Sequence, residues 1–236
     1  MNAPRIVAIY PGSFKPPHAG HLRAIEYLLN ECGSDQIHII ISNRSRLIPG
    51  TACALGADLA RRLFELQLSY AGFPLDKIII EIAEHRAADH ALAYIGRAAK
   101  DQTLLFAIGQ LDHEHNDPRF ADIDSLSASA GVQARVQVLP ADENPIRASI
   151  FRRAIGQGEA GRTTFFEGMH RRLTIEKKEE LWGLARTSLK PVAEIYRFKL
   201  DPILRGQFEV SAWSVTTENE TTTDPEFTWP GKNSSR

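Results

Sequence analysis

The stretch Tyr10-Pro11-Gly12-Ser13-Phe14-Lys15-Pro16-Pro17-His18-Ala19-Gly20-His21-Leu22 joins a short apolar run to a segment with helical spacing. Residues 6–10 are continuously apolar, which predicts a buried strand. Gly12 gives the following loop backbone freedom and lets a ligand approach the chain. Pro16 and Pro17 stiffen the loop and remove two hydrogen-bond donors. The pattern therefore predicts a strand, a tight loop and a helix that begins near Gly20.

The start of this predicted helix has the chemistry of a phosphate site. The first N–H groups of a helix are free, and the helix dipole places positive charge beside them. His18 and His21 are three residues apart, so both rings can face one side of the first turn. Imidazole N–H groups donate hydrogen bonds to phosphate oxygens. The junction thus predicts binding of a phosphate-bearing ligand.

The first 155 residues alternate between strand-like and helix-like segments, which predicts an α/β fold. Strands alternating with helices form a parallel sheet with helices on both faces. The predicted strands are residues 6–10, 36–42, 77–82, 103–108 and 134–139. The predicted helices are residues 22–29, 59–68, 88–99 and 119–130. Ligands bind at the carboxyl ends of such strands, near the point where the strand order reverses.

The pattern changes after residue 155, where Gly156, Gly158 and Gly161 break the preceding helix. We predict an α/β domain over residues 1–158 and a helical extension over 159–200. Within and after the extension, residues 163–189 read as helical, and residues 194–200 and 208–215 as short strands or loose extensions. Residues 201–236 form a tail that we expect to be partly disordered, because from Thr216 aliphatic residues are few.

Composition excludes several classes of function. The chain has 236 residues, with 28 Lys and Arg against 29 Asp and Glu, so the net charge of −1 argues against nucleic acid or anionic lipid as a partner. Two cysteines, Cys32 and Cys53, exclude a disulfide scaffold, and neither sits in a pattern typical of a nucleophile. We expect a cytoplasmic protein, because no leader pattern and no membrane-spanning run is visible.

Residues 12–22, GSFKPPHAGHL, resemble the HxGH signature of the nucleotidylyltransferase superfamily in its longer form, G-[ST]-F-x-P-x-H-x-G-H-L. That form is typical of nicotinamide or nicotinate mononucleotide adenylyltransferases and of phosphopantetheine adenylyltransferases. A second motif of these families, I-S-[AS]-T-x-[IV]-R-x-x-[IL], resembles residues 146–155. Ser149 takes the Thr position and Arg152 the Arg position, whereas Arg147 replaces the usual Ser.

The resemblance implies a Rossmann-like fold of the HUP type and transfer of a nucleotidyl group with release of pyrophosphate. ATP and a small phosphate-bearing acceptor would be the partners, with Mg²⁺ bound to the triphosphate and no metal site on the protein. His18, His21 and Arg152 would be the catalytic residues. The nucleotide would be bound by Gly12, Ser13, Phe14, Gly20, Gly109 and Ser149. The acceptor would be bound by Lys15, Arg44 and Arg46.

Several residues keep a second interpretation. Lys15 is equally a solvated loop lysine, and Arg44 and Arg46 can belong to a solvated loop. An extra residue before Asp112 puts in doubt its match to the I-G-x-D motif, and residues 112–117 look metal-binding only by residue type. His85 and His90 could contact the acceptor. Trp182 is expected in the core.

The resemblance leaves the acceptor open. Nicotinamide mononucleotide, which would give NAD, is favoured, followed by phosphopantetheine or another adenylyl or cytidylyl acceptor. An HxGH ligase would share the first motif, but the KMSKS-like loop of the aminoacyl-tRNA synthetases is missing. A nucleotide-binding sensor without activity is the third hypothesis, because Arg147 departs from the motif. A homo-oligomer is also open.

Overall fold

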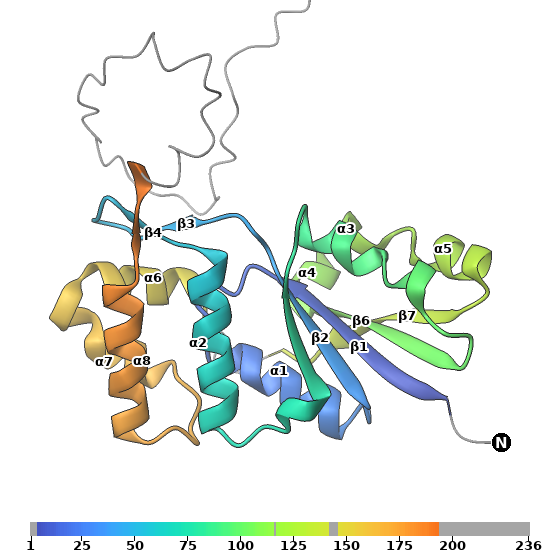
Figure 1. The fold of residues 1–236 in the computed structure, drawn as a ribbon, viewed down its shortest axis with the longest axis horizontal. Helices are drawn as coiled ribbons and strands as arrows, with labels where there is room; N and C mark the ends of the chain where they lie inside the picture. Colours follow the sequence, from blue (N-terminus) through green and yellow to red (C-terminus); the bar gives the residue numbers. More distant parts are fainter. Residues whose placement is uncertain (1–3, 116, 142–145, 194–236) are drawn as a thin grey trace, which may run out of the picture. The chain divides into compact units, whose positions relative to one another are not determined.

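The computed structural model describes residues 4–115, 117–141 and 146–193. The described residues belong to one compact unit. All five predicted strands are present, with ends shifted by up to two residues (Figure 1). They are β1 (Arg5–Gly12), β2 (Gln36–Ile41), β5 (Ile78–Ile82), β6 (Gln102–Gly109) and β7 (Gln133–Leu139). They form one parallel sheet in the order β5-β2-β1-β6-β7.

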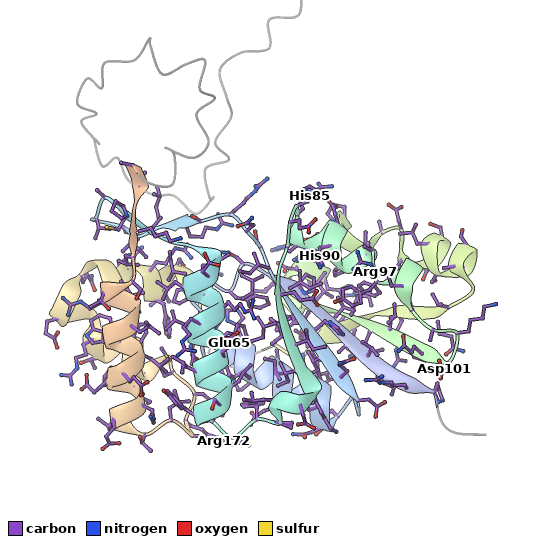
Figure 2. All side chains as sticks on the ribbon, viewed as in Figure 1. Glu65, His85, His90, Arg97, Asp101 and Arg172 are labelled. Atoms are coloured by element: carbon purple, nitrogen blue, oxygen red, sulfur yellow. The ribbon has the colours of Figure 1, made fainter. Side chains whose placement is uncertain are left out.

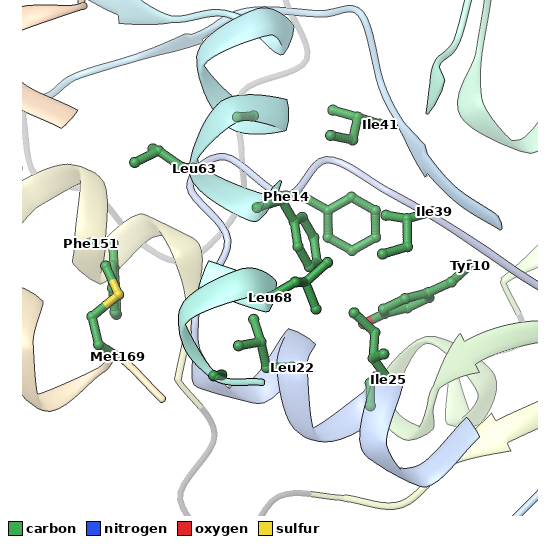
Figure 3. Close-up of a cluster of buried hydrophobic side chains, with 14 of the residues drawn as sticks. Tyr10, Phe14, Leu22, Ile25, Ile39, Ile41, Leu63, Leu68, Phe151 and Met169 are labelled. Carbon is green, nitrogen blue, oxygen red and sulfur yellow. The ribbon is translucent and has the colours of Figure 1, made fainter. Parts of the chain in front are cut away.

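The inner strands β1, β2 and β6 are mainly apolar because helices cover both faces of the sheet, whereas the edge strand β7 also carries Gln133, Arg135 and Gln137. On one face, Ile37, Ile39 and Ile41 of β2 join the larger core, against α1 (Ala19–Asn30) and α2 (Ala57–Tyr70). Figure 3 shows part of this cluster. Ile40 points to the opposite core, where α3 (Ala87–Leu92) and α5 (Ile123–Ala130) pack. The alternation along one strand thus supplies two cores.

Two of the predicted helices are shorter than their patterns indicated. The segment predicted over 88–99 contains α3 and then a separate turn η2 (Ile95–Arg97), and the segment predicted over 119–130 contains η3 (Pro118–Phe120) and then α5. Gly96 lowers helix propensity within the first of these segments. The remaining short helices of the sheet region are η1 (Leu75–Lys77) and α4 (Gln110–Glu114).

The region predicted to be helical over 163–189 contains two helices. After α6 (Ala148–Gly156) and η4 (Gly158–Gly161) come α7 (Arg162–Glu167) and α8 (Ile175–Thr187). Thr174 starts α8 by accepting a hydrogen bond from the Lys177 N–H, which is a local signal for a new helix. Trp182 is buried, as expected of a core residue, and α8 packs along α2 (Figure 1).

A small antiparallel sheet that the sequence did not predict joins the extension to the loop after β2. It consists of β3 (Arg46–Leu47), β4 (Cys53–Leu55) and β8 (Lys190–Pro191), in the order β3-β4-β8. The Val192 N–H continues the pairing by donating to the Ala52 oxygen at 2.9 Å. Strands of two or three residues are too short for a period-2 pattern, so they escape sequence reasoning.

Several predictions concern residues outside the described part of the chain. The strands predicted over 194–200 and 208–215 and the tail 201–236 lie there. The domain boundary at residue 158 stays a prediction. None of the helices in the described part is both long and apolar enough to cross a membrane.

Glycines allow the extension to pack closely on the rest of the fold. A Cβ on Gly156 would lie 2.0 Å from the Pro49 oxygen, in the loop after β2. A Cβ on Gly168 would lie 2.1 Å from the Phe151 ring, and one on Gly161 would lie 1.9 Å from the Ala154 oxygen. Real Cβ atoms do not approach backbone atoms this closely, so these positions require glycine.

We expect Gly156→Ala to lower the free energy of unfolding by about 1–3 kcal/mol, because the added methyl must displace backbone at Pro49. Gly183→Ala is the matched control: it lies inside α8 with nothing within 4 Å of its would-be Cβ. This control should raise stability by about 0.5–1 kcal/mol through helix propensity. Urea denaturation of both variants checks the pair, and equal stabilisation by both would contradict the packing argument.

Candidate active site

The strand order reverses between β1 and β6, and the sequence-predicted residues gather there. From β1 the chain moves outward through β2 to β5, then returns to β6 and continues to β7. The loops after Gly12 of β1 and Gly109 of β6 therefore lie on either side of the switch point, where open α/β sheets bind ligands. The first of these loops leads directly into α1, so the predicted phosphate-binding segment stands at the switch point.

Phe14 gives this loop its shape. Its φ of 51° lies in the left-handed region, which is strained for a bulky residue and occurs at functional loops. The ring is buried and packs edge-on against Tyr10 at 5.0 Å, His21 at 4.9 Å and Phe64 at 5.3 Å between centroids. Figure 3 shows it inside the cluster. A contact of Phe14 with the nucleotide would therefore come from its backbone, while its side chain is core.

The structure corrects the reason for Gly12. We expected it to supply unusual backbone freedom, but its φ is not positive. A Cβ on Gly12 would instead lie 2.7 Å from the Phe14 ring. Glycine is required because the ring of Phe14 folds back over β1. The sequence suggested an unusual backbone conformation at Gly12, whereas the structure has it two residues later, at Phe14.

His18 and His21 stack at the start of α1, as their spacing predicted. Their ring centroids are 3.7 Å apart, and His18 caps the helix. The backbone N–H of His18 donates to Nδ1 of His21 at 3.1 Å. Because Nδ1 accepts this bond, a neutral His21 carries its proton on Nε2. His18 Nδ1 is buried and makes no hydrogen bond to the described residues.

Burial keeps both imidazoles neutral. It lowers the pKa of His18 to about 3, with a smaller contribution from the nearby Arg23 charge. Burial also lowers the pKa of His21 well below its usual value, and the neighbouring His18 adds to the effect. At neutral pH this pair offers N–H donors without positive charge. Charge for a phosphate must come from other residues.

The extension caps α1. The Ala19 N–H, the first of the helix, donates to the Gly168 oxygen at 2.9 Å. The His18 ring lies 5.7 Å from that of Phe151 on α6, which packs on Gly168. One predicted phosphate-binding N–H is therefore already used by the protein, and a ligand at this helix end would meet later N–H groups and the imidazoles.

Lys15 is buried, so its interpretation as a solvated loop lysine is wrong. Its ammonium donates to the carbonyl oxygen of Ser13 at 3.1 Å and to that of Ser42 through a shorter bond. Burial, with the nearby Arg46 charge, lowers the pKa of Lys15 to about 8.

Two arginines converge on the same loop from different elements. Arg152 of α6 donates through Nη1 to the Lys15 carbonyl oxygen at 2.9 Å. Arg46 of β3 places Nε 3.5 Å from Ser13 Oγ, at the limit of a hydrogen bond. The structure thus brings together the two sequence motifs and the loop after β2 around residues 13–15. This convergence supplies the positive charge that the neutral imidazoles lack.

Other predicted residues are less tied to the loop. Arg44, Arg147 and Ser149 are exposed. Arg147 is the N-cap residue of α6; its backbone is extended and its side chain makes no capping hydrogen bond. Gly20 lies in the first turn of α1. A Cβ on Gly109 would meet nothing closer than Asp112 Oδ2 at 3.9 Å, so there is open space beside this backbone.

Residues 112–119 form an ion-pair network. Arg119 binds Asp112 through Nη2 and Asp117 through Nε, the latter at 2.8 Å. This pairing, with hydrogen bonds from Arg119, lowers the pKa of Asp117 below its usual range despite partial burial. Within residues 4–115, 117–141 and 146–193, no three His, Cys, Asp or Glu side chains are arranged to hold a metal ion.

A cleft of about 330 Å³ opens beside this network, next to the end of β6. It is lined by Ile108, His113, Asp117, Pro118, Phe120, Ala121 and Val136. Sequence reasoning singled out Asp117 and His113 only as weak metal ligands and passed over Pro118 and Phe120. Pro118 and Phe120 follow Gly109 by nine and eleven residues, so no short motif marked them.

The histidines considered for the acceptor occupy a different place. His85 is exposed, whereas His90 on α3 lies with Nε2 3.5 Å from Glu81 Oε2 (Figure 2). Glu81 also binds His38 Nδ1 at 2.9 Å and accepts a hydrogen bond from the Tyr94 hydroxyl. This group ties α3 to β2 and β5.

Cys32 and Cys53 are both free and half-buried.

Comparison with known proteins supports the motif. Residues 9–50 match the cytidylyltransferase-like family. The chain is 29% identical over 127 residues to the nicotinate-nucleotide adenylyltransferase of Salmonella typhi, covering 50% of this chain and 55% of that protein. It is 32% identical over 111 residues to the probable nicotinate-nucleotide adenylyltransferase of Cronobacter sakazakii, covering 45% and 49%. The chain thus spans about half the length of the curated relatives it matches.

Among solved structures, the Plasmodium falciparum nicotinic acid mononucleotide adenylyltransferase complexed with NaAD is similar at a TM-score of 0.43. It is 12% identical, and the match covers 83% of this chain and 97% of that one. A bifunctional NMN adenylyltransferase/ADP ribose pyrophosphatase from Francisella tularensis has a TM-score of 0.43 at 17% identity, covering 82% and 49%.

The buried imidazoles predict an acid-sensitive fold. Burial lowers the pKa of His18 to about 3 in the folded protein, from the ordinary histidine value of 6.5, so the unfolded chain gains a proton first as the pH falls. The free energy of unfolding should therefore decrease by about 2 kcal/mol between pH 7 and pH 5 from this group alone. Urea denaturation of wild type and His18→Asn at both values checks this. Equal pH dependence in the two proteins would contradict a buried, neutral His18.

Proposed function

We propose that this chain, a member of the cytidylyltransferase-like family of HxGH nucleotidylyltransferases, transfers AMP from ATP to a small phosphate-bearing acceptor and releases pyrophosphate. The observation that carries the proposal is the stacked pair His18 and His21 at the switch point, on a loop to which Arg46 and Arg152 both reach. Cationic groups and N–H donors are gathered where a triphosphate would lie.

The chemistry needs little covalent help from the protein. An oxygen of the acceptor phosphate attacks the α-phosphorus of ATP, the bond to the β-phosphate oxygen breaks, and pyrophosphate leaves. Positioning and stabilisation of the charge on the transferred phosphoryl group supply the rate enhancement. His21 would donate from Nε2, since its Nδ1 is occupied by the His18 N–H. His18 would donate beside it, and α1 would direct its dipole at the same oxygens.

The remaining parts of the nucleotide have matching surfaces. The cleft beside β6 has an apolar wall that includes Ile108, Pro118 and Phe120, with Asp117 at the same cleft. These groups suit an adenine base and the hydroxyls of its ribose. The open space at Gly109 lets the nucleoside pass close to the backbone between this cleft and the loop. Ser149, exposed on the first turn of α6, would contact the β- and γ-phosphates.

Mg²⁺ accompanies ATP in this proposal without protein ligands. The side chains that converge on residues 13–15 are cations and imidazoles, whereas Mg²⁺ prefers oxygen ligands. The described residues therefore do not fit direct coordination of the ion, which would be held by phosphate oxygens and water. Its contribution would be to neutralise triphosphate charge.

Nicotinate or nicotinamide mononucleotide is the proposed acceptor, with dinucleotide as the product. The curated relatives carry the name nicotinate-nucleotide adenylyltransferase, which favours the nicotinate form. Arg44 and Arg46 follow β2, and Arg46 reaches the phosphate loop, so they would bind the acceptor phosphate. Phosphopantetheine is the second candidate acceptor. A cytoplasmic location and an oligomeric state stay predictions.

The first experiment is pyrophosphate release from ATP or CTP with Mg²⁺ and each of nicotinate mononucleotide, nicotinamide mononucleotide and phosphopantetheine. We expect release with ATP and one acceptor, and a fall in kcat of about 10²–10³-fold in His18→Asn, the range for a lost transition-state donor. Arg61→Ala, an exposed residue of α2, serves as the control. ATP binding without release with any acceptor would refute the transferase proposal and favour a nucleotide sensor.

The acceptor assignment has its own test. Replacing Arg44 and Arg46 with Gln should raise the KM for the acceptor by about 10-fold or more, since each loses a charge-assisted phosphate contact. The KM for ATP should change much less in Arg44→Gln, because this residue makes no contact with the phosphate loop among those the structure shows. Steady-state kinetics with each substrate varied in turn separates an effect on the KM for the acceptor from an effect on the KM for ATP. Unchanged acceptor KM in both variants would remove these arginines from the acceptor site.

A further inference from the structure

Lys15 is a buried charge that the proposed mechanism has not yet used. Its exposed fraction is 0%, the lowest of the lysines in the described residues. Its ammonium bridges two carbonyl oxygens, that of Ser13 in the loop after β1 and that of Ser42 at the end of β2. These two segments are already neighbours, since the Ser42 N–H donates to the Gly12 oxygen at 2.8 Å. Lys15 therefore adds a second bond across the carboxyl ends of β1 and β2.

The surroundings of this ammonium make its burial unfavourable for the stability of the fold. Among the described residues Lys15 forms no ion pair with a carboxylate, and the charge that acts on its ammonium is that of another cation, Arg46 from β3. A buried ammonium without a counter-ion is unfavourable, and the lowered pKa expresses this. A hydrophobic residue would suit the site better unless the charge has a use.

The two segments that Lys15 joins have different proposed tasks. Ser13 belongs to the loop that would bind the triphosphate, and its side chain lies 3.5 Å from Arg46 Nε. Ser42 begins the loop proposed for the acceptor, and its Oγ accepts from the Arg44 N–H at 3.4 Å. The Lys15 carbonyl is in turn held by Arg152. Lys15 and the Ser42 N–H together hold the nucleotide loop beside the acceptor loop.

We propose that Lys15 is a positioning residue, whose protonated ammonium clamps the Ser13 and Ser42 carbonyls so that the nucleotide loop and the acceptor loop are held in register for reaction. This inference rests on the proposed function and replaces the direct contact with the acceptor that the sequence suggested. The clamp needs the charged form, because an ammonium donates three strong hydrogen bonds to carbonyl oxygens and a neutral amine donates fewer and weaker ones. Loss of the clamp should therefore weaken the binding of both ATP and the acceptor.

The clamp should be visible in wild type as a pH dependence. Its ammonium loses its proton above a pKa of about 8 in the free protein, while a bound triphosphate favours the charged form. We therefore expect the Kd for ATP to rise about 10-fold between pH 7.5 and pH 9.5. His18 and His21 are neutral across this range, and arginine stays charged, so neither produces the change. The γ-phosphate of ATP titrates below this pH range, so it does not produce the change either.

Variants identify the group responsible. In Lys15→Met, ATP should bind about 10-fold more weakly at pH 7.5, with no further weakening up to pH 9.5. The KM for the acceptor should rise by a similar factor. Lys15→Arg, which stays charged, should bind ATP at pH 9.5 as tightly as wild type does at pH 7.5. Lys178→Met is the matched control, because Lys178 also donates to a backbone carbonyl, that of Phe166 at 3.0 Å, but on α8 away from the loop. It should leave all these values unchanged.

The outcomes separate the clamp from the proposed function. Lys15→Met with wild-type ATP affinity, or with the wild-type pH dependence retained, overturns the clamp while leaving the transferase proposal intact. A change for ATP with an unchanged acceptor KM also overturns it, because that is the result of a direct phosphate contact. If Lys15→Met does not fold by circular dichroism, the wild-type and Lys15→Arg pH profiles decide alone. Wild type that binds no ATP at either pH overturns the function and the clamp together.

Discussion

The packing of Phe14 onto Gly12 is the constraint on which the site depends. The ring folds back over the end of β1 and lies against Tyr10, His21 and Phe64, at the cost of a left-handed backbone at Phe14. This anchors the loop in the core on one side and presents the following residues at the switch point on the other. Hydrophobic burial thus holds a strained loop in place, and the strain is located beside the proposed chemistry.

Charges from two other elements then converge on the loop that Phe14 anchors, which has a charge of its own in Lys15. Lys15 reaches to the end of β2, Arg152 comes from α6 and Arg46 from β3. The imidazoles of α1 are buried and neutral, so these cations carry the positive field of the site. The extension contributes as well, because Gly168 caps α1 through its carbonyl oxygen. Residues after the second motif therefore help to build the site.

How far each feature could be predicted depended on how local its cause is. The five strands and the stacked histidines follow from apolar runs and from i, i+3 spacing, and they appeared where expected. The hairpin β3-β4 with β8 could not be predicted, because its strands are too short for a pattern and its third strand is far away in sequence. Gly12 was identified for the wrong reason, since the ring it accommodates belongs to a side chain whose direction no sequence pattern reports.

By itself, the sequence determined the order of the elements, the position of the loop between β1 and α1 and the residue types available for phosphate chemistry, because these depend on neighbours within a few positions of the chain. Only the tertiary structure decided that His18 and His21 are neutral, that Lys15 faces two carbonyls instead of solvent, and that Arg46 and Arg152 reach the same loop. Protonation and contact both depend on burial by segments distant in sequence, and burial is a property of the folded chain alone.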